Sequence, residues 1–220
     1  MFYSSTEKKL VTLKEYVTRM KEGQDKIYYA CGETVDKIDM LPQVEGVKDK
    51  GYEILYLTDE IDEFVLQVLV NYEEKEFANV SANDLNLDSE EDKKKIEKLN
   101  EDSKDMLTLM QEAIPEVAKV CFTNRLKDHP VCLTSEGAIS VEMQKVINAL
   151  PNNKSIQAKT SLEINENHAI TQKLKSLYET DKEALKSYAK ILYAQAKLIE
   201  GLSIDNPTEI SNLICDLISK

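Results

Sequence analysis

Apolar residues in the first third of the chain alternate between helical spacing and short β-rich runs. Leu13, Tyr16 and Met20 recur at helical spacing, and a β-rich run follows over residues 26–31. The whole pattern predicts alternating helices and strands over residues 13–21, 26–31, 34–50, 52–57, 60–70 and 77–80. Such alternation is typical of a small sheet covered by helices. Residues 1–10 show no such pattern and are expected to lie outside regular structure.

A polar stretch from Asn83 to Lys95 interrupts this pattern and is interpreted as a linker that runs into a new helix. We therefore expect two domains, over residues 1–85 and 86–220. Elements expected in the second domain are helices over 90–113, 139–150 and 181–200, a final helix from Pro207, and strands over 117–122, 130–133 and 162–165. The predicted fold class is α+β: a small αβα subdomain followed by a mostly helical domain with a short sheet.

The segment that opens this pattern also carries a family resemblance. Thr12 and Glu15 have capping-box spacing, and Gly23 is a suitable helix stop. The string TLKEYVTRMKEGQDKIYYACGET (12–34) resembles, almost residue for residue, a segment of the heat shock protein 90 chaperone family. Further stretches resemble the family in the same order: KGYEILYLTDEIDEF (50–64), VCFTNRLKDHPVCL (120–133), LEINENHAI (162–170) and EGLSIDNP (200–207). The resemblance implies that residues 1–85 close the family's middle segment and that 86–220 form its C-terminal dimerisation domain.

The resemblance also implies what this part of the protein does not do. The family's nucleotide-binding domain and its catalytic arginine have no counterpart here, and no glycine-rich phosphate loop is present. The full-length protein is expected to use ATP and magnesium, whereas this part is expected to be no enzyme, with no catalytic residue, cofactor or metal. The chain ends at Lys220 without the acidic MEEVD tail of eukaryotic cytosolic members, so a bacterial type is expected.

The last forty residues predict two helices with broad apolar faces. Thr180 and Glu183 have capping-box spacing before a helix over 181–200, and Asn206 with Pro207 marks the start of the final helix. Periodicity alone leaves open whether the final helix folds back on its own domain. In the family, the two helices pair with their counterparts in a four-helix bundle, which implies a homodimer. The expected interface residues are Leu185, Tyr188, Leu192, Ile199, Ile210, Leu213, Ile214 and Leu217.

A second apolar stripe lies on the predicted helix over 139–150. By periodicity alone, such a stripe is more often core than surface. The stripe resembles the family's exposed amphipathic helix, which contacts unfolded or partly folded client proteins. The resemblance therefore predicts a client-binding surface of exposed side chains at Met143, Val146, Ile147 and Leu150. The residues Pro151, Asn152 and Asn153 are expected to end this helix.

The net charge and the positions of the cysteines indicate which classes of partner and which cellular compartment to expect. The chain has 40 acidic and 28 basic residues, a net charge of −12, which disfavours nucleic acid and anionic membranes. No apolar run approaches the roughly 20 residues of a spanning helix. Four scattered cysteines, without a CxxC pair, are interpreted as buried free thiols in a reducing cytoplasm: Cys31, Cys121, Cys132 and Cys215.

Two rival functions stay open. One is a dimeric scaffold without client-folding activity, and the other is a small-molecule enzyme on the first α/β unit. The candidate groups for chemistry have simpler interpretations: Asp59 and Asp62 at the start of a helix, His129 and His168 in structural roles, and Cys31 without a histidine partner. Asn124 and Arg125 are expected to fix the turn between two strands.

Overall fold

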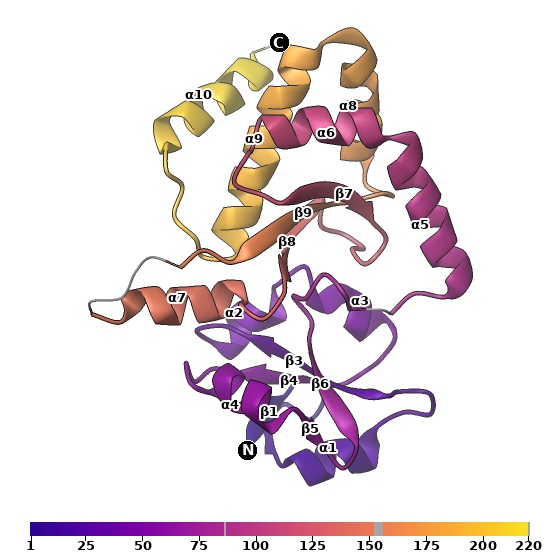
Figure 1. Cartoon of the computed structure of the whole chain (residues 1–220), viewed down its shortest axis with the longest axis vertical. Helices are drawn as coiled ribbons and strands as arrows, with labels where there is room; N and C mark the ends of the chain where they lie inside the picture. The colour runs from indigo at the N-terminus through magenta and orange to yellow at the C-terminus, as the bar shows by residue number, and fades with distance from the viewer. Residues whose placement is uncertain (86, 152–155, 220) are drawn as a thin grey trace. The chain divides into compact units, whose positions relative to one another are not determined.

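A computed structural model describes residues 1–85, 87–151 and 156–219, which form two compact units (Figure 1). The first comprises Met1–Leu87 and Ser135–Lys159, and the second comprises Asp88–Thr134 and Thr160–Lys220. The expected split after residue 85 therefore misses the return of Ser135–Lys159 to the first unit. Backbone hydrogen bonds explain that return, since Ser135 N donates to Ser81 O and Asn83 N donates to Ser135 O.

A six-stranded sheet forms the centre of the first unit, in the order β2-β1-β4-β3-β6-β5. Its strands are β1 Phe2–Ser4, β2 Leu10–Val11, β3 Lys26–Cys31, β4 Ile54–Leu57, β5 Asn71–Tyr72 and β6 Lys75–Asn79. The helices of this unit are α1 Leu13–Arg19, α2 Val35–Asp39, α3 Val44–Asp49, α4 Asp62–Leu69 and α7 Val141–Ala149. Because β3 is parallel to both β4 and β6, the carboxyl ends of these three strands lie at one edge.

Side-chain alternation along β3 explains why helices cover both faces of this sheet. Tyr28 belongs to an apolar cluster with Ile38 of α2 and Val47 of α3. Its neighbour Tyr29 belongs to a second cluster, which includes Tyr16 of α1 and Leu66 of α4. The predicted strand over 26–31 and the predicted Thr12–Glu15 capping box are both confirmed.

The expectation that residues 1–10 lack regular structure is wrong. β1 pairs antiparallel with both β2 and β4, and two serines secure it: Ser4 Oγ donates to Glu53, and Ser5 Oγ accepts from Ile54 N at 2.8 Å. Strands this short carry little periodic signal, since their stability comes from pairing with the rest of the sheet.

The second unit combines a three-stranded sheet with five helices in the described part of the chain. The sheet has the order β7-β9-β8, with β7 Lys119–Thr123, β8 Val131–Glu136 and β9 Lys159–Asn165. The helices are α5 Glu90–Asp102, α6 Lys104–Glu112, α8 Ala169–Thr180, α9 Lys182–Ile199 and α10 Pro207–Ile218. α6 lies against β7 and α9, and α8 lies beside α9 (Figure 1). The α+β fold class is confirmed.

Two helix boundaries in this unit differ from those predicted. The single helix expected over 90–113 is broken at Ser103, which ends α5 and precedes α6. The cap of α9 is Asp181 rather than Thr180, because Asp181 accepts from Ala184 N at 2.9 Å while Thr180 still belongs to α8. No helix among the described residues is both long and apolar enough to cross a membrane.

The two-residue turn between β5 and β6 offers a test of local strain. Glu73 and Glu74 both have positive φ, at 48° and 63°, a conformation that costs a residue with a side chain roughly 1–2 kcal/mol. We expect Glu74→Gly to raise the free energy of unfolding by about 0.5–1 kcal/mol in urea titrations. The same replacement at Glu76, within β6, should lower it by a similar amount. A loss of stability in Glu74→Gly would contradict this interpretation of the turn.

Candidate functional site

Helix α7 is attached to α4 through its first residues. Gly137 has a φ of +82°, which lets the chain turn after β8. Ser140 then caps α7, because its Oγ accepts from Met143 N at 3.0 Å. The same hydroxyl donates to Oε2 of Glu63 on α4 at 2.6 Å. One serine therefore starts the helix and fixes its position on the first unit.

Glu63 is a buried carboxylate with several hydrogen-bond donors, and only 4% of its surface is exposed. Its Oε1 accepts from Asn79 Nδ2 at 2.6 Å, and the side chains of Cys31 and Tyr29 also bond to it. Burial raises the pKa of Glu63, against the opposing effect of these hydrogen bonds. The carboxylate thus joins β3, β6, α4 and the start of α7.

The Cys31 thiol in this cluster has the wrong electrostatics for a nucleophile. Burial raises its pKa well above the ordinary value, and the charges of Glu63 and Glu142 raise it further. A reactive cysteine needs the opposite, a neighbouring cation or base that lowers the pKa. This arrangement does not favour the enzyme alternative.

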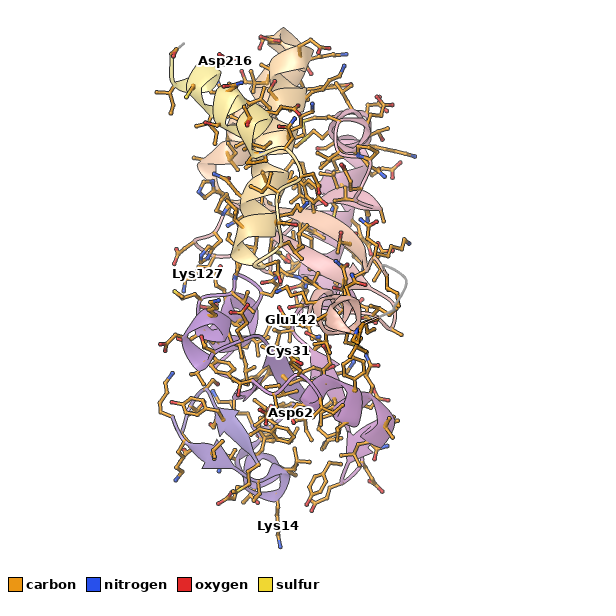
Figure 2. All side chains as sticks on the ribbon, turned by 90° about the vertical axis from the view of Figure 1, so that its left-hand side faces the viewer. Lys14, Cys31, Asp62, Lys127, Glu142 and Asp216 are labelled. Atoms are coloured by element: carbon orange, nitrogen blue, oxygen red, sulfur yellow. The ribbon has the colours of Figure 1, made fainter. Side chains whose placement is uncertain are left out.

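A cavity of about 380 Å³ opens beside this cluster, at the carboxyl ends of β3 and β4. Its apolar lining includes Leu57, Phe64 of α4, and Met143, Val146 and Ala149 of α7. Figure 2 shows Cys31 and Glu142, from β3 and α7, close to one another, and both line this cavity. The cavity has the size and mixed lining of a small binding site.

The predicted client-binding residues are not uniformly exposed. Met143 is only 6% exposed, and its sulfur lies 3.0 Å from Gln67 Nε2 of α4, so the expectation of an exposed Met143 is wrong. Val146 and Ile147 are half-buried, and Leu150, just after the helix, is 55% exposed. α7 ends at Ala149; of the residues expected to end it, Asn152 and Asn153 lie outside the described residues.

The predicted dimer-interface residues also divide into two groups. Leu185 and Leu192 are buried in the second unit's own core, so they have no surface to offer a partner, and their assignment to an interface is corrected. Tyr188 is half-buried and packs against the same core. The partly or largely exposed group comprises Ile199, Ile210, Leu213, Ile214 and Leu217. α10 contains no buried residue and is tied to α9 by the Lys190–Glu209 pair at 2.6 Å.

The remaining candidate groups have structural contacts. His168 Nδ1 accepts from Ile170 N and caps α8, and the His129 carbonyl accepts from Asn165. Arg125 lies 3.1 Å from Glu163 of β9, which fits its expected role in the turn. Burial raises the pKa of Asp62, which lies in the first turn of α4 without a side-chain cap at that helix.

None of the four cysteines, all within the described residues, forms a disulfide bond, as expected. Cys132 is buried, and Cys31 and Cys121 are partly buried. Cys215 is exposed on α10, so the expectation of burial is wrong for this thiol.

Sequence reasoning missed the residues that hold α7: Glu63, Gln67, Asn79 and Ser140. Ser140 carried a usable signal, because serine directly before an apolar helical run is a common cap. Glu63 carried none, since its partner Ser140 is 77 residues away in the chain.

The chain was also compared with known proteins. A family model described as Hsp90 protein matches residues 1–220. The chain is 52% identical over 219 residues to the chaperone protein HtpG of Clostridium botulinum strain Langeland. It is 51% identical over 219 residues to those of Clostridium perfringens strain 13 and Clostridium acetobutylicum. Each match covers 99% of this chain but only 35% of the length of the relative.

Removing the Glu63 carboxylate tests its role in holding α7. Glu63→Ala leaves Asn79 and Ser140 without their acceptor, so we expect a loss of about 2–4 kcal/mol in the free energy of unfolding. Glu63→Gln keeps an acceptor and should cost about 1 kcal/mol or less at neutral pH. Glu60→Gln, an exposed change at a neighbouring position, should be within about 0.5 kcal/mol of the parent.

The pH dependence of unfolding gives a second readout of Glu63. Because its pKa in the folded chain is raised above 4.5, the folded state binds this proton more readily than the unfolded state. Its favourable contribution is complete below pH 4.5 and is lost as the pH rises through the raised pKa. In urea titrations at several pH values, the free energy of unfolding of Glu63→Gln should not show this decrease as the pH rises. If the free energy of unfolding changed with pH in the same way for parent and variant, the pKa of Glu63 would not be raised in the folded chain.

Proposed function

Because this chain belongs to the Hsp90 family, we propose that it is a chaperone segment that joins two protomers and presents a surface to client proteins. The observation that carries the proposal is helix α10, which has an apolar side but no buried residue. The matched relatives are named chaperones, which supports the same role for the whole protein.

The dimer proposal follows from the energetics of α10. Ile210, Leu213, Ile214 and Leu217 recur at helical spacing, and each keeps accessible surface. A helix of twelve residues is marginal in water unless its apolar side packs against something. Exposed apolar residues at the end of α9, including Ile199, extend the same kind of surface. Two copies of α9 and α10 together would bury these residues in a four-helix bundle.

The client-binding proposal rests on the exposed part of the α7 stripe. Leu150 is exposed and Val146 and Ile147 are half-buried, so these three residues can contact a partner without rearrangement. Met143 would contribute only after moving away from Gln67. We place this activity in the cytoplasm, and we propose that ATP and magnesium act through parts of the full-length protein that this chain does not span.

The burial of Met143 also keeps the scaffold alternative open, because a smaller exposed stripe gives less surface for clients. A scaffold would form the same dimer but would not keep an unfolding protein soluble. The two experiments below therefore separate the two functions.

Charge placed on α10 should disrupt the proposed dimer. Ile218, the last residue of α10, is 80% exposed and lies one helical turn after Ile214 on the same side. We expect Ile214→Asp with Ile218→Asp to weaken self-association at least about tenfold, because each substitution occurs twice in a two-fold symmetric interface. Light scattering across a dilution series would measure the mass. Ser211→Asp with Asn212→Asp adds the same charge at exposed polar positions of α10 and serves as the matched control. A monomeric parent chain, or equal masses for both variants, would contradict a dimer through this helix.

Removal of two apolar side chains from the α7 stripe should reduce protection of clients. We expect Leu150→Ser with Ile147→Ser to lower the suppression of aggregation of a heat-unfolded model protein, because less apolar surface remains for binding. Turbidity against chaperone concentration measures the effect. Leu10→Ser removes a leucine of similar exposure from β2 and should leave protection unchanged. A parent chain that dimerises without suppressing aggregation would support the scaffold.

A further inference from the structure

Helix α10 lies beside α9, but burial of its own side chains does not fix it there (Figure 1). The loop between the two helices is anchored at its start, where Leu202 N donates to Lys197 O at 2.8 Å and Leu202 packs against the core. Beyond this point, residues 203–219 include no buried residue. Another interaction must therefore set the position of α10.

Two ion pairs supply that interaction. Lys190 Nζ lies 2.6 Å from Glu209 Oε1 in the first turn of α10, and Lys197 Nζ lies 3.0 Å from Asp205 Oδ2 just before this helix. The hydrogen bond from Lys190 lowers the pKa of Glu209, and that from Lys197 lowers the pKa of Asp205. The two lysines are seven residues apart, which places them on the same side of α9.

One partner of each pair is already held by its own segment. The Lys197 side chain is only 13% exposed, and its Nζ lies 5.6 Å from the centre of the Tyr193 ring. Glu209 Oε2 accepts from Asn206 Nδ2, and Asn206 Oδ1 accepts from Glu209 N. Such contacts reduce the conformational entropy that is lost when an ion pair forms, which is one reason why most exposed pairs contribute little.

We propose that Lys190 and Lys197 are positioning residues for the dimer. Their ion pairs to the start of α10 hold this helix against α9 before two chains meet. This inference rests on the proposed dimer and adds the charged groups that prepare its apolar surface. Because both protomers must present a docked α10, any loss of docking lowers the apparent affinity once for each chain.

Ionic strength distinguishes these ion pairs from the overall charge of the chain. A chain with a net charge of −12 repels a second copy, so added salt strengthens a dimer that depends on apolar contacts alone. Salt also screens the ion pairs and so acts against docking of α10. We therefore expect Lys190→Gln to weaken self-association at low salt and to match the parent in about 1 M salt.

Sedimentation equilibrium of this 220-residue chain measures the dissociation constant of the dimer. We expect Lys190→Glu to raise this constant about threefold to tenfold at low salt, because it places two carboxylates together in each protomer. Lys186→Glu is the matched control, since Lys186 pairs with Glu183 of α9 itself at 2.8 Å. This control should stay within about twofold of the parent.

A charge exchange tests the pairing directly. Lys190→Glu with Glu209→Lys restores opposite charges in reversed order, so this chain should associate more tightly than the Lys190→Glu chain. Lys190→Glu with Asp216→Lys makes the same change in charge, but exposed Asp216 lies two turns further along α10 (Figure 2). This second combination should not restore association.

Hydrogen exchange of the α10 amides measures docking without a dimer. In a chain made monomeric by Ile214→Asp with Ile218→Asp, Lys190→Gln should speed exchange over residues 210–218 at low salt. Lys186→Gln in the same background should leave the exchange rates unchanged, because its partner lies on α9.

Equal effects of Lys190→Glu and Lys186→Glu, or a charge exchange that restores no affinity, would overturn the proposal. A difference between the parent and Lys190→Gln that persists in high salt would also contradict it, since screening should remove an ionic effect. A dimer that forms normally whatever stands at Lys190 would reject only this inference. A parent chain that is monomeric at every concentration would instead reject the proposed dimer, and the exchange rates would still report whether the ion pairs hold α10.

Discussion

The architecture of the first unit depends on one buried carboxylate. Glu63 accepts hydrogen bonds from side chains of β3 and β6 and from Ser140, the cap of α7. A buried charge is costly unless donors surround it, so its neighbours are constrained to their positions. Without this group, α7 would lose the contact that fixes its first turn, and the cavity between α4 and α7 would lose one wall.

The Glu63 carboxylate also makes this edge of the sheet better suited to binding a ligand than to catalysis. Ligands commonly bind at the carboxyl ends of parallel strands, where the cavity lies. Burial raises the pKa of the Cys31 thiol, and the nearby charges of Glu63 and Glu142 raise it further, which disfavours a cysteine nucleophile at this edge. The resulting surface is apolar and acidic, with the character of a recognition site.

Periodicity predicted which residues share a helix face, but not where that face points. The strand over 26–31 and the caps at Thr12 and Asn206 were recovered, because each depends on residues close in the chain. Met143 and Leu185 were assigned to surfaces, and both are buried, because burial is decided by segments distant in sequence. The Glu63 cluster could not be predicted for the same reason.

The exposure of helix α10 has a thermodynamic consequence beyond the interface proposed for it. None of its twelve residues is buried within the chain, so the helix is held mainly by its contact with α9 and by any surface that covers it. In the proposed dimer, folding of this segment and association of protomers become one equilibrium governed by mass action. Dilution of such a dimer would unwind α10 as it separates the chains, and a protease would cleave a single chain more readily than an assembled pair.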